Sequence, residues 1–502
     1  MITHYIYRQY CFYLFILIGC VNNLYSQDIT GKIIDQETQE PIPYVSIILN
    51  ETEGGISNEE GDFSITTSQH ILKNDSVYFS SIGYKTKAIL LQDIKNSTIF
   101  LEPEILELSN VYISGQKLTV DDIINKLKNN ISKNYNSNST KHRFFMRESF
   151  KQYYKKLKFD YKKSSIKEIS KKLIDSMVSS IPKRTSYYNE TLGDYYSNFE
   201  RNYKKLHIIK TSKLYNKNQE VSFQGLQKKF MQVLNDNVKK SSYLKVKSGF
   251  FGTKIGVDSI VNSAKNFDKI KQEYEQKNYF ISRKKSIETL TKNVFYNEES
   301  EINVIQSSGR YNFVKKDFTY IDGELVYIIE FSPKRYKGFI GTLYINTEDF
   351  AVMRLDYSNA NPVYDKIFNM FGVNFNHVKY RGTMIFKKFE ENNYYSLKYL
   401  NHENGRSLLL NRPLTIIEKN KHVKGRRKQN ELRLQMNFDL IDRVKRELLV
   451  FTETNTTPEE FISFKEKKLV DVKYLSNYNA DFWKGYNIIE PNKAIKEFTV
   501  IK

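Results

Sequence analysis

Short apolar runs broken by turn residues begin at Asp28 and recur about every ten residues up to Leu101, a spacing typical of a small all-β unit. Glycine allows positive φ in the turns and proline is excluded from central strands, so both residue types mark the breaks. The pattern predicts a β-sandwich over residues 27–115, with strands near 29–34, 44–49, 62–66, 75–80, 86–90 and 97–101.

The turn and core positions of this unit have a defined spacing: Gly31, Asp35, Pro41, Pro43, Gly54, Gly61, Phe63 and Gly83. In this spacing the segment resembles the carboxypeptidase-regulatory-like domain. The resemblance implies a Greek-key sandwich of the transthyretin (prealbumin) type, with Phe63 pointing into its core, and it implies no peptidase chemistry. Such domains occur at the N-terminus of secreted and outer-membrane proteins in the Bacteroidetes type of cell envelope.

Residues 1–26 have the pattern of a signal peptide. Arg8 precedes an apolar run over 11–21, which is too short to anchor the chain across a bilayer. Cleavage is expected after Ser26, which predicts an exported protein of the periplasm or outer membrane. Alternatively, the segment ending in Cys20 resembles a lipobox, and acylation of Cys20 would tether the protein to a membrane. Cys11 and Cys20 are the two cysteines of the chain, so the mature protein would have no disulfide and no thiolate nucleophile.

Charge is unevenly distributed along the chain. The net charge is +21, but residues 27–115 hold 14 Asp and Glu against 5 Lys, which gives −9. Since Arg8 adds +1, residues 116–502 carry +29. We hypothesise that the acidic sandwich docks on the basic body or on a basic partner. The alternatives are an acidic domain that serves solubility and a body that is merely rich in lysine. Nucleic acid is not expected as a partner of an exported protein.

Residues 116–300 are predicted to form a mixed helical and β region of basic character. Thr119 has the features of a helix N-cap, with carboxylates in the first turn and apolar residues at helical spacing up to about Asn134. The segment Phe144-Phe-Met146 is typical of a strand. Lysine-rich sequence predicts helices at 164–180 and 226–240 and a mobile basic insertion around 160–220.

Residues 301–455 are predicted to form an antiparallel meander, because alternating apolar runs are joined by Asp322-Gly323 and by 346–349. About fifty residues of this region are similar to the curved sheet of outer-membrane lipoprotein carriers. That resemblance implies an apolar concave face able to hold an acyl chain, and the alternative is an ordinary core covered by a helix. Further strands are expected at 376–387, 394–401, 432–440 and 447–452. Trp483 is expected to pin the tail, 456–502, on the body.

The sequence contains no recognised catalytic, cofactor-binding or metal-binding motif. No His is followed three residues later by Glu, and neither a nucleophile elbow nor a Gly-rich phosphate loop is present. The fold class expected is mainly β, with an N-terminal sandwich and a larger α+β body. The function expected is that of a non-enzymatic envelope protein that binds or assembles with an unknown protein or lipid. A lipid or lipoprotein carrier and a hydrolase of unrecognised type are the alternatives.

Overall fold

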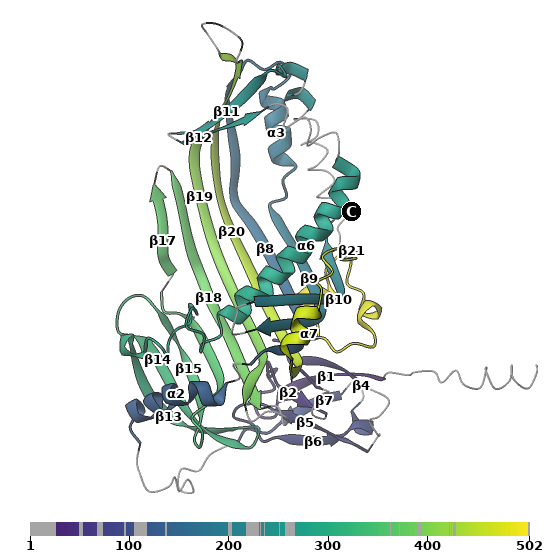
Figure 1. The fold of residues 1–502 in the computed structure, drawn as a ribbon, viewed down its shortest axis with the longest axis vertical. Helices are drawn as coiled ribbons and strands as arrows, with labels where there is room; N and C mark the ends of the chain where they lie inside the picture. The colour runs from purple at the N-terminus through teal and green to yellow at the C-terminus, as the bar shows by residue number, and fades with distance from the viewer. Residues whose placement is uncertain are drawn as a thin grey trace, which may run out of the picture.

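The computed structural model describes residues 27–49, 54–67, 74–94, 97–104, 118–135, 138–198, 203–216, 230, 232–234, 236–249, 251–256, 267–361, 363–370, 372–388, 394–420, 422, 424 and 428–499. Two parts lie one above the other: a small N-terminal sandwich at the base and a long curved sheet rising from it (Figure 1). The predicted signal peptide, with Cys20, lies outside the described residues.

The N-terminal unit is a sandwich of two sheets, as the sequence predicts. One sheet has the order β4-β1-β7 and the other β3-β2-β5-β6. The two sheets share one buried apolar core, in which Phe63 is 1% exposed and packs edge-on against Phe79. The strands are β1 (Gln27–Asp35), β2 (Ser46–Ile48), β3 (Gly54–Ile56), β4 (Asp62–Thr67), β5 (Ser76–Ser80), β6 (Lys87–Leu90) and β7 (Ser97–Leu101).

The glycines of the sandwich signature differ in how strictly their positions require glycine. Gly61 and Gly83 have φ values of +75° and +76°, the left-handed region that favours glycine. A Cβ on Gly61 would lie 2.5 Å from the backbone oxygen of Ile33, whereas nothing lies within 4 Å of the corresponding position on Gly83. Gly54 also has a positive φ, of 155°. A Cβ on Gly54 would lie 2.3 Å from the backbone oxygen of Ile47, so glycine is required strictly at positions 54 and 61 and less strictly at position 83.

Asp35 organises the turn after β1. Its Oδ1 accepts hydrogen bonds from the backbone N–H groups of Thr38 and Glu37, and its Oδ2 accepts one of 2.7 Å from the Tyr84 hydroxyl. The bonds from Thr38 and Tyr84 hold the pKa of the Asp35 carboxyl below its usual value. Gly31 lies opposite Phe63, Pro41 bridges to Ile34, and Pro43 is exposed in a turn.

The body consists of one large sheet within the described residues. Its main path runs β13-β14-β15-β16-β18-β19-β20-β8-β9-β10-β21, and β11, β12 and β17 join it at the side. The strand bounds are β8 (Thr140–Ser164), β9 (Arg184–Asn198), β10 (Tyr203–Tyr215), β11 (Ser242–Ser248), β12 (Phe251–Gly256), β13 (Tyr311–Ile321), β14 (Glu324–Pro333), β15 (Phe339–Asn346), β16 (Val352–Asn359), β17 (Val363–Met370), β18 (Val373–Lys388), β19 (Tyr395–Asn420), β20 (Lys428–Asn455) and β21 (Lys473–Leu475).

Two expectations for the body are wrong. The region 160–220 is no insertion, because β8, β9 and β10 occupy most of it and pair within the large sheet. The strands expected at 432–440 and 447–452 are one continuous strand, β20, which pairs with β19 and β8 along its length. The sheet therefore crosses residue 300 and joins the regions 116–300 and 301–455.

Helices cover one face of this sheet, which we call the inner face. The predicted helix is confirmed as α2 (Val120–Asn134), which begins with a capping box formed by Thr119 and Asp122. The long α6 (Phe267–Lys292) crosses the sheet diagonally, and α3 (Lys171–Ser179) lies near its upper end (Figure 1). The short elements are α7 (Pro458–Ser463), α8 (Lys493–Lys496) and the 3-10 turns Leu91–Asp93, Ser308–Arg310 and Ala480–Trp483.

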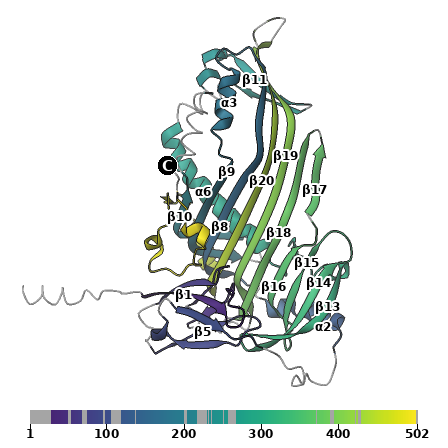
Figure 2. The same cartoon turned by 180° about the vertical axis from the view of Figure 1, so that it is seen from behind.

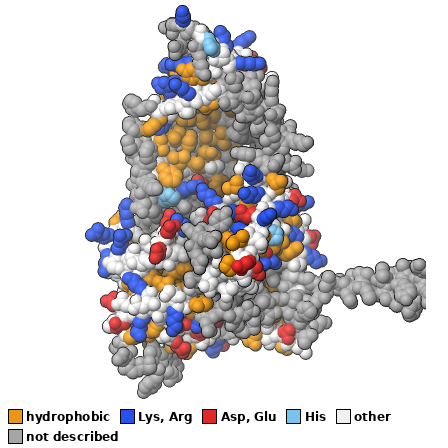
Figure 3. Space-filling model, in the orientation of Figure 1, with side chains coloured by type: hydrophobic (Ala, Val, Ile, Leu, Met, Phe, Trp, Pro, Cys, Tyr) orange, Lys and Arg blue, Asp and Glu red, His pale blue; other side chains and the backbone are white. Residues whose placement is uncertain are grey.

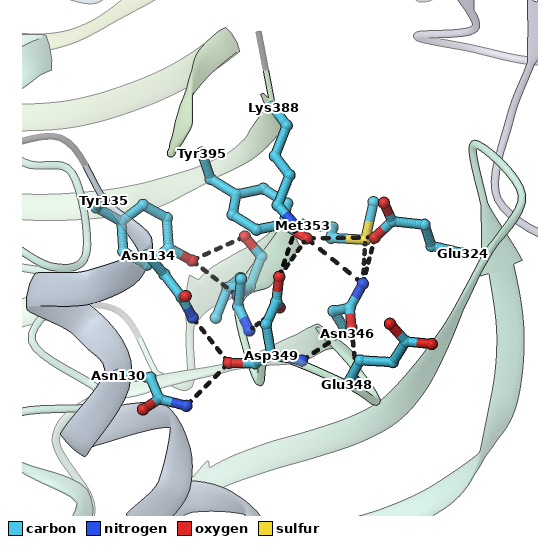
Figure 4. Close-up of polar contacts among 12 residues, drawn as sticks. Asn130, Asn134, Tyr135, Glu324, Asn346, Glu348, Asp349, Met353, Lys388 and Tyr395 are labelled. Atoms are coloured by element: carbon cyan, nitrogen blue, oxygen red, sulfur yellow. Dashed lines mark hydrogen bonds and ion pairs between the residues drawn. The ribbon is translucent and has the colours of Figure 1, made fainter. Parts of the chain in front are cut away.

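The predicted meander is confirmed in β13 to β16, and its turns follow the expected chemistry. Asp322 and Gly323 both have positive φ, the requirement of a two-residue hairpin turn. In the next turn, the Asn346 side-chain oxygen accepts the Glu348 N–H at 2.8 Å. The Asn130 and Asn134 side chains at the end of α2 donate to the Asp349 carbonyl oxygen (Figure 4). These contacts fix the lower end of the meander on α2.

The acidic sandwich lies against the base of the body (Figure 2). Both charged and apolar contacts hold it there. The Glu59 carboxylate forms an ion pair of 2.8 Å with Lys445 on β20 and accepts a hydrogen bond from Asn492. Asp62 lies 3.6 Å from the Lys496 ammonium. Tyr44 packs against Tyr399 with ring centroids 5.3 Å apart. The contacts agree with the docking that the charge difference predicts.

Trp483 holds the C-terminal segment on the body, as predicted. Its side chain is 2% exposed and packs edge-on against Phe145 of β8. Its indole N–H donates to the Glu190 carboxylate at 2.6 Å, and Arg147 donates to the same carboxylate. The tail is thus anchored at the base of the sheet by a few buried side chains, Trp483, Ile488 and Ile489.

Candidate functional site

The long strands β18, β19, β20 and β8 have inner faces that align row by row. Residues directly opposite one another in an antiparallel pair point to the same face of the sheet. Leu400 lies opposite Leu448, which lies opposite Met146, and these three side chains are buried with Ile287 of α6. The inner face at this lower level is therefore an ordinary packed core.

Higher on the same strands, the inner face carries apolar side chains that are only partly exposed rather than buried. The first row consists of Phe375, Leu408, Leu440 and Tyr154, and the next of Val373, Leu410, Phe438 and Leu157. Met436 continues the face on β20. We call the set formed by Val373, Phe375, Leu408, Leu410, Met436, Phe438, Leu440, Tyr154 and Leu157 the apolar strip.

The apolar strip is not part of any of the buried clusters that the described residues form. Figure 3 shows hydrophobic side chains gathered at this level, above α6. Further up, Leu432 and Leu434 are buried against Ile174 of α3. The strip is thus an open stretch between two packed regions of the same sheet face.

The opposite, outer face is polar on β20 and β8 between the strip residues, although Leu409 of β19 also lies on this face and is 48% exposed. Between the strip residues of β20 lie Gln435, Asn437 and Asp439, and Lys156 and Lys158 take the corresponding places on β8. The alternation shows that the apolar residues belong to one face, which a soluble sheet normally covers. An apolar face that remains partly exposed is a candidate binding surface.

A charged group of residues, which we call the charged boundary, separates the strip from the packed core below. Arg406 donates two hydrogen bonds to Asp442 across the β19–β20 pair, at 2.8 and 3.1 Å. Two rows lower, beyond the row of Val444 and Phe150, Glu148 of β8 accepts 2.7 Å bonds from Arg446 of β20 and from Arg283 of α6. The boundary therefore joins three strands to the helix.

Electrostatics at the boundary favour anions. Burial alone would raise the pKa of the Glu148 carboxyl, but the guanidinium groups of Arg283 and Arg446 lower it to about 2. Burial, together with the charge of Arg446, lowers the pKa of the His402 imidazole to about 4. At neutral pH Glu148 is therefore ionised and His402 is uncharged.

A small cavity of about 70 Å³ lies in the packed core beneath α6. His142 and Glu453 line it and form a 2.8 Å hydrogen bond between imidazole and carboxylate. Ser396 also lines the cavity, but its hydroxyl has no hydrogen-bond partner in the described structure. No hydrogen bond thus connects this serine to the imidazole, as an activated nucleophile requires.

Two larger recesses lie where the sandwich meets the body. One, of about 660 Å³, is lined by charged and apolar residues that include Glu59, Arg381, Glu403 and Lys445. The other, of about 460 Å³, lies between the sandwich and the β13–β14 turn and is lined in part by Lys388 and Tyr395. Figure 4 shows both side chains in hydrogen bonds or ion pairs with Asp349. In the first recess, Glu59 pairs with Lys445, and Arg381 pairs with Glu403.

The signature residues predicted from the sequence gather in the sandwich and not at the apolar strip. His402 and Glu403 point to opposite faces, as expected for neighbours on a strand: His402 contacts Tyr357, and Glu403 pairs with Lys379 and Arg381. In the part of the chain that the structure describes, no group of three or more His, Cys, Asp or Glu side chains is arranged to hold a metal ion.

The sandwich core, the strained turn at Gly61 and the inward Phe63 agree with one known domain type. Residues 29–113 match the CarboxypepD_reg-like domain family. This CarboxypepD_reg-like domain ends before α2, so the long sheet lies outside the match. No curated protein matches the chain. None of the helices in the described ranges is long and apolar enough to cross a membrane.

Several solved structures are similar to parts of this chain. A DUF1329 family protein from Desulfovibrio piger is 8% identical, with 64% of this chain and 90% of the other covered and a TM-score of 0.18. MucB is 6% identical, with 63% of this chain and 91% of the other covered and a TM-score of 0.17. The matching chain of the MucA/MucB complex of Pseudomonas aeruginosa is 6% identical, with 64% of this chain and 92% of the other covered and a TM-score of 0.15. At these TM-scores the likeness supports no inference about function.

Proposed function

We propose that this chain is a non-enzymatic protein of the cell envelope that binds the acyl chain of an amphiphile along the apolar strip. The main support is that the strip is partly exposed, although the regions above and below it on the same inner face are packed. The CarboxypepD_reg-like domain supports the envelope location, because domains of the type that it resembles occur in exported proteins.

The dimensions of the strip suit an acyl chain. From Met436 to Leu440 the strand advances about 13 Å, at about 3.3 Å per residue. One leaflet of a bilayer has a hydrocarbon depth of about 15 Å, half of the usual core thickness. The strip is therefore about as long as the acyl chain of one membrane lipid.

Burial of hydrocarbon provides the binding free energy. Each methylene transferred from water contributes about 0.8 kcal/mol. Two added methylenes therefore tighten binding by up to about fifteenfold, until the chain is longer than the strip. A dependence on chain length that reaches a plateau is the signature of an extended apolar site of finite length.

The test is isothermal titration calorimetry of the purified protein with 1-monoacylglycerols of increasing chain length, below their critical micelle concentrations. We expect saturable binding that tightens with chain length and is lost in Phe438→Asp, which places a charge on the strip. Asn437→Asp introduces the same charge one residue away on the outer face and should bind as the wild type does. Absence of binding by the wild type, or equal loss in both variants, would contradict the proposal.

A further inference from the structure

The charged boundary lies directly beside the apolar strip on the same inner face. Arg406 is two residues from Leu408 on β19, and Asp442 is two residues from Leu440 on β20, so each pair points to one face. The Arg406 side chain is 40% exposed, and that of Arg446, two rows lower, is 23% exposed. A ligand lying on the strip would thus meet these two guanidinium groups at its lower end.

The boundary has an excess of positive charge. Its cations are Arg283, Arg406 and Arg446, and its anions are Glu148 and Asp442, so the group carries a net charge of +1. Glu148 is shared by two guanidinium groups and also accepts a hydrogen bond from Ser286. One carboxylate therefore compensates two cations.

Arg283 shows that the compensation is incomplete. The residue is 3% exposed, and its Nε and Nη1 groups have no hydrogen-bond partner in the described structure. A buried N–H group without an acceptor costs about 1–3 kcal/mol. Additional negative charge near the boundary would be stabilised by the same field that keeps Glu148 ionised.

We infer that the ligand of the apolar strip is an anionic amphiphile, whose headgroup lies against Arg406 and Arg446 while its acyl chain lies along the strip. This inference rests on the proposed function. Guanidinium groups bind carboxylates and phosphates through charge-assisted, often paired, hydrogen bonds. A fatty acid and an acidic phospholipid share this chemistry, and the experiment below distinguishes them.

The experiment compares three probes with twelve-carbon chains by isothermal titration calorimetry: dodecanoate, dodecyl phosphate and 1-monododecanoylglycerol. One charge-assisted hydrogen bond is expected to tighten binding of the anions about tenfold relative to the neutral probe. The preference should weaken as salt is raised. The anion that binds more tightly identifies the headgroup as carboxylate or phosphate.

Arg406→Gln should weaken binding of the two anionic probes about tenfold and change the affinity for the neutral probe less than twofold. The double variant Arg406→Gln, Asp442→Asn removes the carboxylate that the first change leaves unpaired, and the loss should persist because Arg406 contacts the headgroup. Arg443→Gln is the matched control, since Arg443 is exposed on the outer face of β20. Thermal unfolding checks that each variant is folded.

Equal affinity of the wild type for the three probes would overturn this inference while leaving the proposed function in place. A loss in Arg443→Gln as large as that in Arg406→Gln would also overturn it, because the effect would then reflect overall charge. If the wild type binds none of the probes, the proposed function itself fails and the inference fails with it.

Discussion

The Arg446 side chain of β20 donates a 2.7 Å hydrogen bond to Glu148, the residue directly opposite it on β8. This pair marks the level at which the inner face of the long sheet changes character. Below it, Leu448 and Met146 are buried under α6, and above it Leu440 and Phe438 are partly exposed. The inner face thus changes from packed core to partly exposed apolar surface along a single pair of strands.

Removal of the Glu148 carboxylate is expected to destabilise the protein strongly. Glu148→Ala leaves Arg283 and Arg446 without their shared anion, and breaking a buried ion pair costs about 3–5 kcal/mol. The free energy of unfolding in urea measures this loss. Glu330→Gln is the control, because Glu330 and its partner Lys316 are both about half exposed. That change should cost less than about 1 kcal/mol.

Stability should fall as the pH is lowered through the range in which the His402 imidazole is protonated in the unfolded chain but neutral in the folded one. The pKa of the folded imidazole is about 4, against an ordinary value of 6.5. Between these values the unfolded chain binds more protons, so stability is complete above pH 6.5 and declines towards pH 4. Unfolding in urea at several pH values measures the slope, and His402→Gln should flatten it. An unchanged slope in the variant would contradict the assignment.

Alanine should be tolerated less well at position 61 than at position 83. Both glycines have a left-handed backbone, which costs an alanine about 1 kcal/mol. Only Gly61→Ala adds a collision, with the Ile33 carbonyl oxygen. Thermal unfolding should therefore show a larger loss for Gly61→Ala than for Gly83→Ala. Equal losses would mean that space at Gly61 has no influence on the stability of the sandwich.

Charge reversal at Lys445 should loosen the docked sandwich. Lys445→Glu would place a third carboxylate beside Glu59 and Glu447, both of which now pair with the ammonium group. Hydrogen exchange at the backbone amides of 57–62 and of 486–493 should become faster. Lys85→Glu reverses a charge in an exposed pair within the sandwich and is the control. Unchanged exchange at the interface would show that the Lys445 ion pairs do not hold the two parts together.

Local patterns predicted much of the fold because their causes are local. Residues close in sequence form the capping box at Thr119, the Asp322-Gly323 turn and the turns that separate the strands of the sandwich. The long β8 was missed because Lys155 and Lys162 occupy bulges, where the register shifts and the alternation changes phase. Lysines on the outer face then obscure the inward Leu157 and Phe159.

The sequence predicted an apolar concave face in the meander, but the inner face there is buried core that includes Val326, Leu343 and Leu355. The candidate site lies instead on the long strands β18, β19, β20 and β8. Alternation over 432–440 was visible in the sequence and indicates a strand with one apolar face. The charged residues between Asp442 and Glu447 interrupt this alternation, and their partners on other strands and on α6 are distant in sequence. Arg283 meets Glu148 only in the folded protein, so no local pattern could reveal the charged boundary.

The most direct test of the account observes the ligand on the apolar strip itself. In protein labelled with ¹³C at leucine methyl groups, 1-monododecanoylglycerol should shift the resonances of Leu408, Leu410 and Leu440 and show intermolecular contacts with them. Leu400 and Leu448, on the same strands but in the packed core, should remain unchanged. Saturating ligand that leaves the three strip leucines unshifted, or that shifts only the core pair, would contradict the proposed binding surface.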